Sequence, residues 1–190
     1  MLGRFNAYMR ARASGRSVLL WLLLTVVSFI FMAFIITPAF QEVTGGLRPL
    51  DLNFGVSAEM VYRDLPSYTD QSRSLYVWFA IADYVYPFAG ATFFSLLWAW
   101  MLNRWPVGWL GFLAAHGLLL FPYLFALIDW LENVGFLVVI FSYPVEYPAI
   151  ANTAGALKTS KPMVEAVIVL LTLVFAVAAV IHARQKRVQS

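Results

Sequence analysis

The chain has 190 residues and a net charge of +3; 62% of its residues are hydrophobic and only 12% are charged. Soluble domains average about 45–50% apolar and about 25% charged residues, and a chain of this length cannot hide so much apolar surface from water. The composition therefore excludes a soluble globular domain and predicts an all-α integral membrane protein. The absence of cysteine excludes disulfides, thiolate metal sites and iron–sulfur clusters.

The first predicted membrane-spanning helix covers residues 18–39, which carry no charged side chain. About 20 predominantly apolar residues suffice to cross the hydrocarbon core of a bilayer. A cleaved signal peptide is the alternative, because arginines precede the apolar run. That run is longer than the apolar part of a signal peptide, and Thr37–Phe40 is a poor cleavage site. We therefore expect an uncleaved first helix.

The outer segment that follows, residues 40–74, is too long for a simple connection. Ser57 can cap a short helix that Pro66 would end. Either Thr69 or Asp70 can then cap the helix that becomes the second span. We therefore expect a partly helical cap that lies on the outer surface of the membrane.

Three further spans complete a predicted four-helix bundle. They are expected at about residues 75–102, 107–131 and 162–183. Pro162 suits a helix start, because its missing N–H would be unpaired there in any case. Residues 134–143 are apolar but too few to span, and one helix from 107 to 143 would be about 55 Å long. We therefore expect a break near Asn133–Gly135, within a single membrane domain of residues 1–190.

Basic residues set the predicted orientation, because Lys and Arg in short loops stay on the cytoplasmic side. Eight of the 13 lie in the N-terminal segment, in the turn after the second span and in the C-terminal tail. None of the ten acidic residues lies in those three segments. We expect both termini in the cytoplasm and the chain in a plasma or inner membrane. Its basic tails can contact anionic lipid, whereas such short clusters beside spans disfavour nucleic acid as a partner.

Acidic residues near the outer ends of three predicted spans are the candidate functional groups. An ionised side chain at mid-membrane costs about 2.5–3.5 kcal/mol on insertion scales, and Asp83 lies about 12 Å along its helix axis from the outer end. Asp129, Glu132 and Asn133 share one helical face at i, i+3 and i+4. Turned inward, such faces would form an outward-facing polar pocket. The predicted pocket residues are Asp83, Tyr86, Asp129, Glu132, Asn133, Lys161 and Glu165.

Structural roles are the alternative for these residues. Asp129 and Glu132 could lie among lipid headgroups, where carboxylates cost little. Glu165 could complement a helix N-terminus, and Asp83 could form an ion pair with Arg73 or Lys161. For His116 we expect a hydrogen-bonded packing role. No metal or cofactor is expected, since the sequence has no phosphate loop, dinucleotide fingerprint, HExxH motif or GxSxG motif.

Several segments of the chain resemble small four-helix membrane proteins of uncharacterised function. These segments span its middle two-thirds and are Pro49–Glu59, Ser74–Tyr76, Asp83, Tyr86–Pro87 and Asp129–Asn133. The resemblance implies a fold but no activity. Acidic residues within spans are also similar in type to those of the sterol-isomerase and sigma-two-receptor superfamily, from which we transfer no site.

Three functional hypotheses follow from the sequence. The first is a membrane protein whose outward-facing pocket binds or passes a small molecule, ion or lipid. The second is an intramembrane enzyme that uses Asp83, Asp129 or Glu132 as acid or base, since desolvation can raise a carboxyl pKa toward neutrality. The third is a non-catalytic subunit or assembly factor. Four helices enclose little volume, so a transporter of this size would need homo-oligomers or a membrane partner protein.

Overall fold

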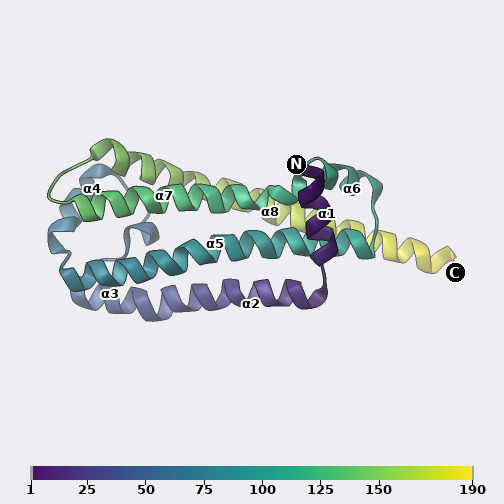
Figure 1. The fold of residues 1–190 in the computed structure, drawn as a ribbon, viewed down its shortest axis with the longest axis horizontal. Helices are drawn as coiled ribbons and strands as arrows, with labels where there is room; N and C mark the ends of the chain where they lie inside the picture. Colours follow the sequence, from purple (N-terminus) through teal and green to yellow (C-terminus); the bar gives the residue numbers. More distant parts are fainter. Residues whose placement is uncertain (1, 190) are drawn as a thin grey trace. The chain divides into compact units, whose positions relative to one another are not determined.

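The computed structural model describes the backbone of residues 2–189 and the side chains of residues 2–185. Within that range the chain folds into helices without any strand (Figure 1). Four helical stretches are long and apolar enough to cross a membrane, which confirms the number of candidate spans. These stretches are Gly15–Thr44, Asp70–Arg104, Leu118–Ser142 and Pro148–Gln185.

The described residues form two compact units that differ in charge. The acidic unit consists of residues 25–87 and 126–162; the basic unit consists of residues 2–24, 88–125 and 163–189. Nine acidic and five basic residues leave the acidic unit at −4. Eight basic residues and one acidic residue leave the basic unit at +7. The two units are described separately below.

The first predicted span is one continuous helical run with a π-helical turn inside it. Its parts are α2 (Gly15–Phe31), the π-helical turn (Met32–Ile36) and α3 (Thr37–Thr44). Pro38 has no N–H for the carbonyl four residues earlier, and the N–H and hydroxyl of Thr37 both donate to the carbonyl of Met32. Gly45, with a φ of 70°, ends α3 in the left-handed conformation.

The third predicted span breaks at a different place from the one expected. Helix α6 (Gly108–Ala115) is followed by Gly117, whose φ of 108° favours glycine and interrupts the helix. Helix α7 (Pro122–Ser142) then runs without a break through Asn133–Gly135. The expected break at that segment was therefore wrong, and Pro122 begins α7 rather than kinking a longer helix.

The fourth predicted span begins earlier than expected. Helix α8 (Pro148–Gln189) starts at Pro148, so the expected start at Pro162 was wrong. Close packing explains why the helix continues, because a Cβ on Gly135 of α7 would lie 2.9 Å from the Cβ of Ala154 of α8. This contact holds the first part of α8 against α7, and α8 continues through Pro162 although proline removes one hydrogen bond from the helix. It also explains why Gly135 does not end α7.

The segment after the first span folds as predicted into a partly helical layer, called here the cap (residues 45–69). Its short helix is α4 (Ala58–Asp64). Ser57 caps α4 by accepting a hydrogen bond from the N–H of Met60. Thr69 caps the following helix, α5 (Asp70–Arg104), by accepting a hydrogen bond from the N–H of Ser72.

An apolar core fixes the cap on the helices of the acidic unit. Buried side chains from the cap, α3, α5, α7 and α8 pack together there. The buried members are Phe40, Leu50, Val56, Val61, Leu65, Tyr68, Tyr76, Phe136, Val139, Ile140, Ala151 and Ala154. Each large apolar side chain in such a core contributes about 1.5–3 kcal/mol relative to its exposure. The cap is therefore a packed layer and not a flexible linker.

The basic unit has a core of its own. Trp98 of α5 stacks on Phe175 of α8, with ring centroids 5.3 Å apart. At the N-terminus, the chain forms a helix that was not expected from the sequence, α1 (Leu2–Arg12). Arg10 of α1 donates to the side-chain oxygen of Asn103 at 2.9 Å, and the Asn103 amide donates back to the carbonyl of Arg10 at 2.8 Å.

Candidate functional site: a capped carboxylate–lysine cluster

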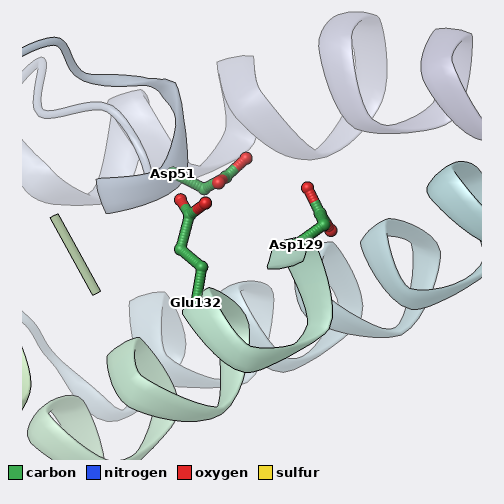
Figure 2. Close-up of side chains that lie close together, drawn as sticks. All are labelled: Asp51, Asp129 and Glu132. Carbon is green, nitrogen blue, oxygen red and sulfur yellow. The ribbon is translucent and has the colours of Figure 1, made fainter. Parts of the chain in front are cut away.

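Three buried carboxyl groups of the acidic unit meet around one lysine. Asp129 and Glu132 extend from α7, and Asp51 extends toward them from the cap (Figure 2). One oxygen of each carboxyl group lies within 4.8 Å of the others. Lys161 Nζ of α8 lies 2.6 Å from Glu132 Oε2, 2.7 Å from Asp129 Oδ1 and 3.0 Å from Asp51 Oδ1. The ammonium group therefore contacts all three carboxyl groups at once.

Local structure places these side chains. The i, i+3 and i+4 spacing of Asp129, Glu132 and Asn133 brings them to one face of α7. Asp51 lies in a single 3-10 turn, Leu50–Leu52, next to the fully buried side chain of Leu50. Because Leu50 anchors this turn in the apolar core, Asp51 is held over α7 although it belongs to a connecting segment.

Asp83 of α5 joins the cluster through an amide bridge. The side-chain nitrogen of Asn133 donates to Asp83 Oδ2 at 2.7 Å and to Asp129 Oδ2 at 3.1 Å. The amide thereby links two carboxyl groups on different helices. Among the described residues, Asp83 forms no ion pair with Arg73 or Lys161, so the ion pair considered from the sequence is not present.

A second lysine of α8 binds the cap. Lys158 Nζ donates to the backbone carbonyl of Asp51 and lies 3.9 Å from its Oδ1. Nearby, the side-chain oxygen of Asn152 accepts a hydrogen bond of 2.8 Å from the N–H of Ala58. Successive turns of α8 thus hold the cap by polar contacts, in addition to the apolar core.

The cluster, defined here as Asp51, Asp83, Asp129, Glu132, Asn133, Lys158 and Lys161, is almost fully enclosed. Glu132 and Asn133 are 0% exposed, Asp83 and Asp129 are 3% exposed, and Asp51 is 7% exposed. Four carboxyl groups face two ammonium groups, so full ionisation would leave two uncompensated negative charges. Burying an unpaired ionised carboxylate costs several kcal/mol even after relaxation. The cluster therefore favours keeping a proton.

Glu132 is the carboxyl group best placed to hold that proton. Neither of its oxygens accepts a hydrogen bond of normal geometry from the residues that the structure describes. Lys161 approaches Oε2 closely enough for charge attraction but not along a hydrogen-bonding direction. As a carboxylic acid, Glu132 can donate a hydrogen bond to Asp51.

The surroundings of Asp51 favour its ionised form. Burial raises the pKa of Asp51, but the hydrogen bond from Glu132 and the positive charges of Lys161 and Lys158 outweigh burial and hold the pKa below its ordinary value of 3.8. A hydrogen bond between two carboxyl groups needs one proton. An ionised Asp51 and a proton on Glu132 meet this requirement.

We expect strong acid to release the cap. Because folding lowers the pKa of Asp51, its contribution to stability is present above the unfolded value of 3.8 and is lost as pH falls from there through the folded pKa. Hydrogen–deuterium exchange of residues 45–69, corrected for intrinsic exchange, should show steady protection near neutrality and a loss in strong acid. If Asp51→Asn lost cap protection in acid to the same extent as the wild type, the loss would not arise from protonation of Asp51.

The structure brings five predicted pocket residues into the cluster and leaves two outside it. The five are Asp83, Asp129, Glu132, Asn133 and Lys161. Tyr86 instead packs in an apolar group with its ring centroid 6.2 Å from that of Phe29. Glu165 is exposed and belongs to the basic unit. His116 follows α6 as an exposed residue, with Nδ1 bonded to the Phe112 carbonyl at 2.8 Å.

Sequence reasoning missed Asp51 and Lys158. An acidic residue in a polar connecting segment gives no signal, because such residues are usually solvated. The sequence feature that could have indicated them is the pair of lysines, Lys158 and Lys161, which are three residues apart on a helix that is otherwise largely apolar. Two partly buried ammonium groups three residues apart need anionic partners.

The three clustered carboxyl groups also have a spacing that suits a hard metal ion. Divalent cations such as Ca²⁺ prefer several carboxylate oxygens at short distance. In this structure the Lys161 ammonium lies 2.6–3.0 Å from Asp51, Asp129 and Glu132 and takes the position of such an ion. The residues therefore do not fit a metal ion unless Lys161 moves away. In comparisons with protein-family models, curated proteins and solved structures, nothing matches the chain.

Proposed function

We propose that the chain is an integral membrane protein whose four candidate spans form a bundle, with both termini in the cytoplasm. Exposed apolar side chains on these helices, including Leu20, Phe34 and Leu170 at 61–70% exposure, are a surface that lipid would cover. The eight basic residues of the basic unit are those that the positive-inside rule assigns to the cytoplasm. Two of them, Lys186 and Arg187, lie outside the residues with described side chains.

The function supported best is binding of a proton by Glu132 beneath the cap, with exchange of that proton toward the outer side. One observation carries this proposal: the Glu132 carboxyl group is fully buried against Lys161 and accepts no normal hydrogen bond within the described chain. The burial of these carboxyl groups also limits the size of a ligand that could reach them. A small molecule or lipid headgroup could not reach Asp83, Asp129 or Glu132 under a closed cap, whereas a proton needs only brief access of water.

The geometry gives proton release a structural consequence. When Glu132 passes its proton to water, it becomes a third carboxylate around Lys161 and can no longer donate a hydrogen bond to Asp51. The added repulsion acts on Asp51, which belongs to the cap. Proton release therefore loosens the cap, and proton binding closes it again.

Infrared spectroscopy of the purified protein tests the protonation of Glu132. The wild type near neutral pH should show the C=O stretching band of a buried carboxylic acid, and Glu132→Gln should lose the part of that band that belongs to Glu132. Glu165→Gln is the matched control and should retain it, because Glu165 is exposed and lies in the basic unit. A band of unchanged intensity in Glu132→Gln would overturn the proposal.

Proteoliposomes that contain a pH-sensitive dye then separate proton passage from proton binding alone. If protons pass, the wild type should collapse an imposed pH gradient faster than empty liposomes, and Glu132→Gln should not. The enzyme and subunit alternatives make different predictions. Turnover that depends on Asp83 or Asp129 would favour an intramembrane enzyme, whereas a stoichiometric co-purifying protein would favour a non-catalytic subunit.

A further inference from the structure

A groove of about 640 Å³ in the basic unit lies between α8 and the start of α6. Its walls are mainly apolar. They include Leu170, Leu173, Val174, Val177 and Ile181 of α8, and Trp109 of α6. None of these residues belongs to the carboxylate–lysine cluster, so the groove is a separate feature of the molecule.

The groove changes from apolar to polar along α8. Its lining is aliphatic from Leu170 to Ile181 and ends with His182 and Gln185. The stretch from Leu170 to Gln185 is about 22 Å long at 1.5 Å per residue. This length exceeds half of a hydrocarbon core, about 15 Å, so the groove can accompany a lipid chain through one leaflet.

The polar end of the groove carries donors and positive charge. His182 Nε2 is buried and has no hydrogen-bond partner within the described part of the chain. The start of α6 also lines the groove, and its N-cap residue, Val107, provides no side-chain cap. Uncapped N–H groups at a helix start favour an anion. The exposed side chain of Arg184 lies on the same turn of α8 as His182 and Gln185.

We propose that this groove binds one phospholipid with an anionic headgroup. An acyl chain would lie along Leu170–Ile181, and the phosphate would accept hydrogen bonds from His182 and the start of α6. Charge complementarity selects an anionic lipid, because the basic unit has a net charge of +7 and Arg184 flanks the polar end. This inference depends on membrane insertion but not on the protonation of Glu132.

Native mass spectrometry of the full chain in detergent tests the proposal with dioleoyl-phosphatidylglycerol and dioleoyl-phosphatidylcholine at equal concentration. One phosphatidylglycerol should be retained, with a preference of about five- to tenfold over phosphatidylcholine. Arg184→Gln should reduce this preference about fivefold. Equal retention of the two lipids by the wild type would overturn the anionic specificity.

A matched pair of tryptophan variants tests the location. Val177 and Val180 are both on α8 and are 57% and 52% exposed, but only Val177 lines the groove. Val177→Trp should fill the groove and reduce lipid retention at least tenfold, whereas Val180→Trp should retain lipid like the wild type. Thermal melting of both variants checks that they fold. Equal retention by two folded variants would overturn the proposed location.

Discussion

Lys161→Met should lower the free energy of unfolding by about 3–5 kcal/mol, the usual effect of removing one partner from a buried ionic network. Methionine retains a long apolar side chain but removes the ammonium group that contacts Asp51, Asp129 and Glu132. Those carboxyl groups would then lie buried without their shared cation. The change can be measured by denaturant titration of the purified protein in mixed micelles.

Lys158→Met is the matched control for this experiment. It makes the same chemical change one turn earlier on α8, but it removes one hydrogen bond to the Asp51 carbonyl and a weaker contact at 3.9 Å. Its expected effect is smaller, about 1.5–3 kcal/mol. Adding Asp129→Asn should recover part of the stability of Lys161→Met, because one unpaired charge disappears. No recovery in the double variant would contradict direct coupling between these two residues.

Features of the fold that depend on neighbouring residues were predictable from the sequence. Ser57 and Thr69 cap their helices as expected, because capping involves side chains and backbone groups only three residues apart. The helix break was not predictable in the same way. Gly117 and Gly135 are both glycines in an apolar run, but Gly135 packs against Ala154, which is distant in sequence. Tertiary contacts thus decide which glycine ends a helix.

The residues of the candidate site also differ in whether local sequence could place them. Helical spacing was enough to place Asp129, Glu132 and Asn133 on one face of α7. The role of Lys161 was clear only in outline, because α8 was expected to start at Pro162, the residue after Lys161, whereas it starts at Pro148. Asp51 could not be found from local pattern, because its position depends on how the cap docks against α8. That docking depends on contacts between residues far apart in the chain.

Gly155→Ala should undock the cap although it changes no charged residue. A Cβ on Gly155 would clash with the backbone carbonyl oxygen of Val56 in the cap. Because the clash is with backbone and not with a flexible side chain, it can be relieved only if α8 and the cap move apart. Overpacking of this kind costs about 1–3 kcal/mol or more, which exceeds the roughly 1 kcal/mol that alanine contributes to a helix over glycine.

Hydrogen–deuterium exchange of residues 45–69 measures this undocking. Gly111→Ala is the control, because it makes the same exchange in a helix where a Cβ meets nothing within 4 Å, and it should leave the cap protected. Since Asp51 moves with the cap, Gly155→Ala should also open Glu132 to water and weaken its carboxylic-acid infrared band. Cap exchange that matches the wild type in Gly155→Ala would contradict the docking described here. If the cap lost its amide protection but the carboxylic-acid infrared band stayed unchanged, the protonation of Glu132 would not depend on the position of the cap.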